Sequence, residues 1–258
     1  MPAAPKPHPR RASLGWKPDL PDFRDHTFAS PRRVARIAPL VDLSTKCPPV
    51  YDQGELGSCT ANAIAAALDF DRLKQGKPLL TPSRLFIYFN ERTMEGTVDQ
   101  DAGAMIRDGI KSVAKQGACP ESAWPYDVSK FTKKPTKACY DAALRYQALS
   151  YMRVNRDLNA FMQCLADGFP IVIGFTVYTS FMSDTVAKTG ILPMPQRGEQ
   201  VEGGHAVLIV GYDSRTRRFL VRNSWGPDWG LKGYFWMPFA YITNPNLSDD
   251  FWTIRVVE

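Results

Sequence analysis

Three residues of the chain carry the side chains that a nucleophilic mechanism needs: Cys59, His205 and Asn223, in that order. A thiol, an imidazole and an amide can serve as nucleophile, general base and orienting group. The chain has only three histidines, and the other two, His8 and His26, lie in a Pro/Arg-rich N-terminal stretch. His205 is therefore the only base of this kind in the body of the protein.

The position of Cys59 suits a reactive thiol, because it directly precedes an apolar stretch with helical spacing. The positive end of the helix dipole and a neighbouring imidazolium both favour the thiolate. His205 would share the thiol proton and later deliver it to a leaving amine. Asn223 would accept a hydrogen bond from the far side of the ring and so fix its tautomer and direction. Together these residues predict catalysis by an activated cysteine.

The segments around these residues resemble the papain family of cysteine peptidases, in particular its short bacterial members. The resemblance covers about Val41 to Met237, and its segments are Val41-Asp42-Leu43, Gln53 six residues before Cys59, His205-Ala206-Val207, and Asn223-Ser224-Trp225-Gly226 followed by Trp229-Gly230 and Gly233-Tyr234. Each segment is weak alone. Four in this order are specific, because unrelated folds place the same chemistry in other orders.

The resemblance implies an α+β papain-like fold, with a helical half, a barrel-like β half and the active-site cleft between them. It implies a cysteine endopeptidase that cleaves peptide bonds through a thioester on Cys59, without a metal or organic cofactor. Gln53 and the backbone N–H of Cys59 would then form the oxyanion hole. Gly103, Gly204 and Trp225 are the residues expected to contact substrate.

The chain departs from the family pattern near the nucleophile. Leu56 stands where these enzymes usually carry a cysteine, so a characteristic disulfide is missing, and Thr60 stands where they usually carry a tryptophan. Their usual pro-segment is also much longer than the stretch that precedes Val41 here. The four remaining cysteines could form two disulfides or stay reduced: Cys47, Cys119, Cys139 and Cys164.

Hydrophobic periodicity predicts helices in the first half of the body and strands in the second. The helices are expected over 60–74 after Ser58, from the Thr81-Pro82 cap onward, around Ile106 to Val113 with a stop at Gly117, and after Asn155. The strands are expected at 171–175, 206–210, 219–221 and 234–237. We expect an N-terminal arm over 1–38 and a peptidase domain over 39–258, with a helical half at about 39–150 and a β half at 151–258.

The arm is rich in proline and basic. Residues 1–36 contain eight Lys or Arg and three Asp, a charge of +5 out of a net +6 for the chain. We expect the first dozen residues to be mobile and Leu14 to Phe28 to pack on the body. Trp16, with Leu14 and Leu20, could lie along the cleft and regulate access to it. Packing on the back of the molecule is the alternative.

Composition restricts the other functions. The near-neutral body and an arm without interleaved aromatic residues argue against nucleic acid binding. A structural zinc site is not expected, since the cysteines lack metal-ligand spacing. There is no apolar run long enough to span a bilayer and no signal-peptide pattern at the start. Secretion and a cytoplasmic location both stay open, and we expect a monomer acting on proteins or peptides.

Two other functions would fit the same residues. An acyl transferase or amidase could use the same triad, because an amine can replace water in attacking a thioester. A binding protein on the same fold could have lost cleavage, although the presence of Cys59, His205, Asn223 and Gln53 argues against it.

Overall fold

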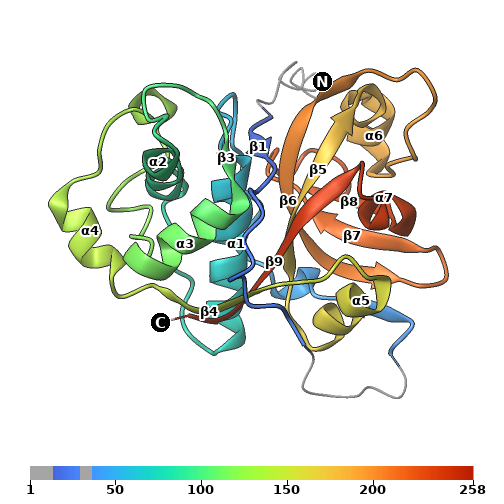
Figure 1. The fold of residues 1–258 in the computed structure, drawn as a ribbon, viewed down its shortest axis with the longest axis horizontal. Helices are drawn as coiled ribbons and strands as arrows, with labels where there is room; N and C mark the ends of the chain where they lie inside the picture. Colours follow the sequence, from blue (N-terminus) through green and yellow to red (C-terminus); the bar gives the residue numbers. More distant parts are fainter. Residues whose placement is uncertain (1–13, 30–36, 258) are drawn as a thin grey trace, which may run out of the picture.

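The computed structural model describes residues 14–29 and 37–257, so the first dozen residues of the arm lie outside it. Helices gather on one side of the molecule and a large sheet occupies the other (Figure 1). The helical side contains α1 (Cys59–Lys74), α2 (Arg84–Glu95), α3 (Ile106–Gln116) and α4 (Lys137–Ala143). Three further helices accompany the strands: α5 (Leu158–Ala166), α6 (Asp184–Thr189) and α7 (Phe239–Thr243).

The large sheet has seven strands, and its neighbouring strands run antiparallel. Six of them follow the order β4-β9-β5-β6-β7-β8, and β2 pairs with β6 outside this path. Their bounds are β2 (Leu40–Asp42), β4 (Ala148–Arg153), β5 (Ile171–Tyr178), β6 (Val201–Asp213), β7 (Arg218–Arg222), β8 (Tyr234–Pro238) and β9 (Ser248–Val257). The predicted α+β class, with a helical half followed by a β half, is confirmed.

Helix α1 is the element that joins the two sides. It is buried over all but its last residues, and it packs against β6 and β9 as well as against α2 and α3. The run of small side chains at 61–67 allows this close approach of other elements on several faces of the helix. Cys59 at its first position therefore lies where the helical side meets the sheet.

Most predicted elements are present, but three helix starts differ from expectation. Helix α2 begins after Ser83, whose hydroxyl caps Phe86, and not at Thr81, which has a left-handed backbone (φ 51°). Helix α5 is capped by Asp157 and not by Asn155. Ser58 precedes α1 without capping it. For α2 and α5 another polar residue within reach of the backbone, Ser83 or Asp157, takes the capping role.

Residues 14–29 run along the boundary between the helices and the sheet (Figure 1). Strand β1 (Trp16–Lys17) pairs in parallel with β3 (Ala104–Met105), forming a small second sheet. Leu14 and Trp16 pack against the core, and Phe28 is buried in it. Leu20 does not follow them, because 68% of it is exposed. The expectation that the arm packs on the body is thus confirmed for Leu14 and Trp16 and wrong for Leu20.

Candidate active site

The thiol of Cys59 is fully buried at the first position of α1. The Ser58 hydroxyl lies 2.5 Å from Tyr126 Oη and accepts from Asn62 Nδ2, which explains why it does not cap the helix backbone. The backbone N–H groups of Ala206 and Gly15 are directed at the sulfur. Ala206 follows His205 on β6, so the fold brings the sheet that carries the imidazole to the thiol.

His205 and Asn223 are held together as expected for a base and its orienting group. His205 Nε2 lies 2.8 Å from Asn223 Oδ1, and both residues are buried. Among the described residues no hydrogen-bond partner is found for His205 Nδ1, which leaves this nitrogen for the reacting thiol. Asn223 follows β7, and its Oδ1 also accepts from the Ser224 backbone N–H at 2.8 Å, which fixes the amide.

Aromatic rings surround the imidazole. The Trp225 ring centroid lies 4.9 Å from that of His205, with an interplanar angle of 31°. Phe175 and Phe181 lie at 5.7 and 6.2 Å from the same ring. These side chains keep water from the His205–Asn223 hydrogen bond, which strengthens it. Trp225 therefore covers the His205–Asn223 pair.

Gln53 is fully buried and tied to the segment that carries Asn223. Its Oε1 accepts from Ser224 Oγ at 2.6 Å, and its backbone N–H donates to Ser224 O at 2.9 Å. Its Nε2 donates to Leu56 O at 2.9 Å, on the turn that leads into Cys59. The Gln53 amide is thus fixed between the turn that leads into Cys59 and the segment that carries Asn223.

The arm covers two of the three residues expected to contact substrate, Gly103 and Gly204. Ala104 N donates to Gly15 O at 2.7 Å, and a Cβ built on Gly103 would overlap that same oxygen. A Cβ built on Gly204 would overlap Trp16 O. Gly103 and Gly204 are therefore positions where the absence of a side chain lets another chain approach closely. Here that chain is the arm itself.

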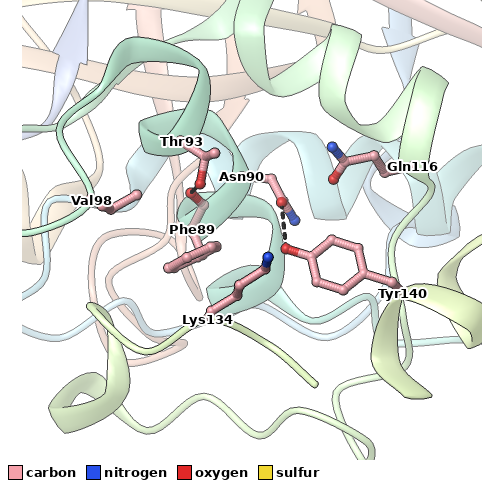
Figure 2. A pocket seen from close by; sticks show the side chains of 7 residues that line it. All are labelled: Phe89, Asn90, Thr93, Val98, Gln116, Lys134 and Tyr140. Carbon is pink, nitrogen blue, oxygen red and sulfur yellow. Dashed lines mark hydrogen bonds between the residues drawn. The ribbon is translucent and has the colours of Figure 1, made fainter. Parts of the chain in front are cut away.

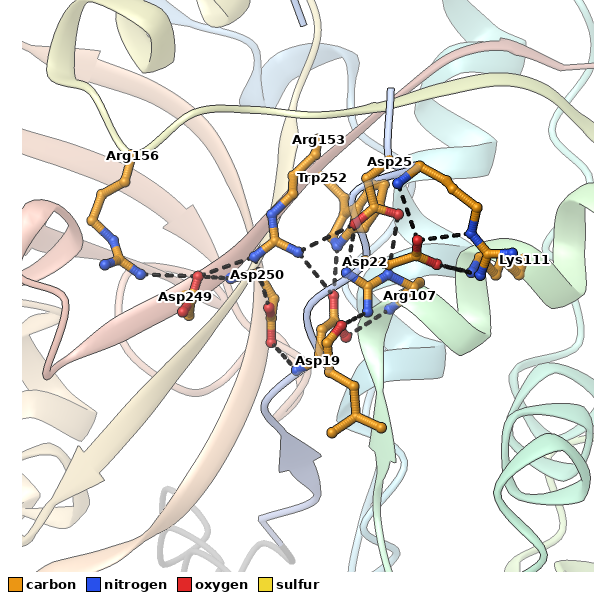
Figure 3. A network of polar contacts seen from close by, with 12 residues as sticks. Asp19, Asp22, Asp25, Arg107, Lys111, Arg153, Arg156, Asp249, Asp250 and Trp252 are labelled. Carbon is orange, nitrogen blue, oxygen red and sulfur yellow. Dashed lines mark hydrogen bonds and ion pairs between the residues drawn. The ribbon is translucent and has the colours of Figure 1, made fainter. Parts of the chain in front are cut away.

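A second set of contacts fixes the arm beyond Trp16. Asp19 and Asp25 of the arm point toward Arg107 of α3 and Arg153 of β4 (Figure 3). Arg107 Nη2 lies 2.5 Å from Asp25 Oδ2, and Arg153 Nη1 lies 3.7 Å from both Asp19 and Asp25. Trp252 Nε1 donates to Asp19 Oδ2 at 2.9 Å. No sequence pattern pointed to this network, because its members are spread over the whole chain.

Burial sets the protonation of the catalytic groups in this arrangement. Desolvation raises the pKa of the Cys59 thiol to about 11, and the charge of Glu91 adds to the rise. Desolvation lowers the pKa of His205 to about 4, although the hydrogen bond to Asn223 opposes the change. The expectation of a lowered thiol pKa is therefore not met here, because the buried pair favours the neutral thiol and imidazole.

The other cysteines carry free thiols, as Cys59 does. Cys119 and Cys139 share a small apolar cluster with Phe86. Burial, followed by the neighbouring Cys139, raises the pKa of Cys119 to about 12. Among residues 14–29 and 37–257 no group of His, Cys, Asp and Glu is arranged to hold a metal ion. Within the same ranges no helix has both the length and the hydrophobicity that crossing a bilayer requires.

A pocket lies on the helical side of the molecule, away from Cys59 and His205. It has a volume of about 400 Å³ and is lined mainly by side chains of the helical side, including Phe89, Lys134 and Tyr140 (Figure 2). Within it, Tyr140 Oη donates to Asn90 Oδ1 at 2.9 Å. Neither Cys59, His205 nor Asn223 lines this pocket, so it is separate from the candidate catalytic groups.

Comparison with known proteins gives consistent matches. A model of the papain family of cysteine proteases matches residues 38–246. A peptidase C1-like protein of Acanthamoeba polyphaga mimivirus is 48% identical over 215 residues, which are 80% of this chain and 69% of that protein. Cathepsin B-like CP3 of Giardia intestinalis is 33% identical over 73% of this chain, which spans 63% of that protein.

Solved structures agree. The crystal structure of xylellain, a cysteine protease from Xylella fastidiosa, matches with a TM-score of 0.89 and 45% identity, covering 99% of this chain and all of that chain. A procathepsin B from Trypanosoma congolense matches with a TM-score of 0.73 at 20% identity, which is a likeness of fold.

Proposed function

Because the chain belongs to the papain family of cysteine peptidases, we propose that it is an endopeptidase that cleaves peptide bonds through a thioester on Cys59. The His205–Asn223 hydrogen bond, together with the unpaired Nδ1 of His205, is the observation that carries this proposal. His205 takes the thiol proton and returns it to the leaving amine, and Asn223 holds the ring in the required tautomer.

Gln53 acts in the oxyanion hole with the backbone N–H of Cys59. Its burial and its two hydrogen bonds to Ser224 support this role, because a fixed donor costs no reorganisation during the reaction. Gly103 and Gly204 bind the substrate backbone. The close passage of the arm over both glycines supports that assignment, since a substrate strand needs the same space. Trp225 lies at the edge of the same site, over His205.

The arm regulates access to this site. Gly15 directs its N–H at the Cys59 sulfur and the arm passes over Gly103 and Gly204, so a substrate and the arm exclude each other. We assign residues 1–38 to the arm and residues 39–258 to a monomeric peptidase domain. Substrate enters when the arm leaves, and its departure also lets water reach the thiol and imidazole.

The test is covalent labelling of the full chain with an epoxide that traps papain-like thiolates, followed by intact mass. We expect a single adduct that forms slowly on the wild type and faster on Trp16→Ala, because the indole holds the arm in place. Cys59→Ala should give no adduct. An adduct that survives Cys59→Ala would exclude Cys59 as the nucleophile, and equal rates for wild type and Trp16→Ala would exclude regulation by the arm.

A further inference from the structure

The proposed oxyanion hole lies on a short turn, and a tyrosine from a distant segment touches both ends of that turn. Gln53 begins the turn, and Ser58 is its last residue before Cys59. The Tyr126 hydroxyl donates to Gln53 O at 2.9 Å and lies 2.5 Å from Ser58 Oγ. The two donors assigned to the hole are the side-chain amide of Gln53 and the backbone N–H of Cys59. One hydroxyl therefore contacts the residue that carries the first donor and the residue that precedes the second.

The peptide group that carries the N–H of Cys59 is held through its oxygen. Ser58 O accepts from the backbone N–H of Asn62 at 3.0 Å and from Asn62 Nδ2 at 2.9 Å. Because a peptide group is planar, fixing its carbonyl also fixes the direction of its N–H. Asn62 Nδ2 donates to Ser58 Oγ as well, at 3.1 Å. The side chain of Ser58 is thus held by Asn62 on one side and by Tyr126 on the other.

These hydrogen bonds form a chain with a single direction. The carbonyl of Gln53 can only accept, so Tyr126 donates to it, and the Ser58 hydroxyl must then donate to Tyr126 Oη. Ser58 Oγ in turn accepts from Asn62. Desolvation raises the pKa of Tyr126 above its ordinary value, so the hydroxyl keeps its proton at neutral pH. Bonds in such a chain polarise and strengthen one another.

Arg84 at the start of α2 fixes the ring of Tyr126. The guanidinium carbon lies 4.0 Å from the ring centroid, and Nη1 donates to Asp52 O at 3.0 Å and to Asn62 Oδ1 at 3.2 Å. Nε and Nη2 donate to the two carboxylate oxygens of Glu121, at 2.9 and 2.7 Å. A guanidinium that is both stacked and paired in this bidentate way has a defined orientation. The Tyr126 hydroxyl is therefore a fixed point against which the turn is held.

We propose that Tyr126 is a positioning residue that sets the spacing of the two oxyanion-hole donors. The inference rests on the proposed peptidase function. Negative charge on the substrate oxygen develops only in the tetrahedral intermediate, and a donor must lie within about 2.7–3.1 Å of that oxygen to stabilise it. A turn that opens would move one donor away, whereas proton transfer from Cys59 to His205 does not involve the turn. Loss of the Tyr126 hydroxyl should weaken binding of the oxyanion and spare the reactivity of the thiol.

The test compares two reagents on the full chain carrying Trp16→Ala. With acetyl-leucyl-leucyl-norleucinal, a peptide aldehyde, the Cys59 sulfur bonds to the carbonyl carbon, the π electron pair moves to the oxygen and His205 takes the thiol proton. This adduct presents an oxyanion to the hole. Dipyridyl disulfide contains no oxygen: the Cys59 thiolate attacks its S–S bond and displaces pyridinethiolate, so its rate reports the thiolate alone.

Intact mass follows the reaction with dipyridyl disulfide, and Cys59→Ala gives the background from the other thiols. Protection of Cys59 by the aldehyde against this reaction gives the dissociation constant of the aldehyde, so no peptide substrate is needed. Urea unfolding of each variant shows that it is folded.

Tyr126→Phe, which keeps the ring beside Arg84, should raise the dissociation constant of the aldehyde about tenfold and change the disulfide rate by less than about twofold. Ser58→Ala removes one contact of the hydroxyl and should raise the constant about threefold. The matched control is Tyr140→Phe, which removes another hydroxyl of the helical side and should leave both values unchanged. In a Gln53→Ala background Tyr126→Phe should add less than about twofold, because one of the two spaced donors is already gone.

Three results would overturn the inference while the peptidase function stands. They are an unchanged aldehyde constant in Tyr126→Phe or Ser58→Ala, the same tenfold loss in the Gln53→Ala background, and a disulfide rate that falls in step with the aldehyde affinity. If Tyr126→Phe does not fold, Ser58→Ala decides alone. A parent chain whose Cys59 reacts with neither reagent would overturn the proposed function, and this inference with it.

Discussion

At the scale of single residues, burial favours the neutral forms of Cys59 and His205, the proposed catalytic pair. A thiolate–imidazolium pair needs solvent or fixed charges to stabilise it, and complete burial removes the solvent. The helix dipole at Cys59 and the Asn223 hydrogen bond both act toward the charged forms, yet desolvation has the larger effect on the pKa of both groups. Removal of the arm would let water stabilise the Cys59 thiolate and the His205 imidazolium, so exposure of the site would also favour its charged form.

Asn223→Ala should lower kcat by roughly tenfold to a hundredfold, because an unoriented imidazole is a poorer base. The free energy of unfolding should fall by only about 1 kcal/mol, the usual worth of one hydrogen bond. Steady-state kinetics and denaturant unfolding measure the two effects.

The matched control is Asn90→Ala, which removes another buried amide, bonded to Tyr140 in the pocket of Figure 2. Asn90→Ala should lower the free energy of unfolding by about as much as Asn223→Ala does, and it should leave kcat unchanged. Wild-type rate constants in a pure Asn223→Ala sample would show that Asn223 does not orient His205.

At the scale of elements, the arm depends on an ion pair that is largely removed from water. The side chains of Arg107 and Asp25 are 6% and 9% exposed, whereas Arg24, which pairs with Asp22, is 74% exposed. A buried charge that loses its partner is costly, while an exposed pair contributes little. The two pairs lie within the same segment of the arm, so they can be compared directly.

Asp25→Asn should loosen the arm and raise the rate of epoxide labelling of Cys59 by about tenfold, which corresponds to about 1.4 kcal/mol of lost docking free energy. Asp22→Asn should change the rate by less than about twofold. Equal rates in the two variants would mean that the Arg107–Asp25 pair does not hold the arm over the thiol.

Much of the element structure follows from local sequence, and the arm contacts do not. The strands around Ile173, Val207 and Val221 are apolar runs whose residue types suit only a buried sheet. Gly117 ends α3 as predicted, because its backbone (φ 74°) favours glycine. The order of Cys59, His205 and Asn223 identified the family, but Asp19 and Asp250 meet across 231 residues of chain, and no local pattern encodes such a pairing.

At the scale of the whole molecule, burying His205 makes stability depend on pH. Its folded pKa, about 4, lies below its ordinary value of 6.5, so the folded state binds fewer protons than the unfolded chain. The contribution of neutral His205 to the free energy of unfolding is fully present above pH 6.5 and is lost as the pH falls through 4. A shift of this size corresponds to a stability change on the order of 3 kcal/mol.

We therefore expect the free energy of unfolding to fall more steeply between pH 6.5 and 4 in the wild type than in His205→Gln, which has no imidazole to protonate. Urea unfolding of both proteins at several pH values measures the difference. Because the two chains share every other titrating group, their difference isolates His205. Parallel curves would mean that the imidazole stays accessible to solvent protons in the folded protein.

The arm is covalently continuous with the body, and this determines how it can be released from the cleft. Phe28 N donates to Arg153 O of β4, and beyond residues 30–36 Ile37 packs against the core and Ala38 O accepts from Tyr212 Oη, so both ends of the connection are fixed. Docking is then an intramolecular equilibrium whose effective concentration does not change on dilution. A single cut within residues 30–36 would leave the contacts of residues 14–28 in place, yet would convert the arm into a separate ligand. From that moment dilution alone, with no further chemistry, would free the cleft.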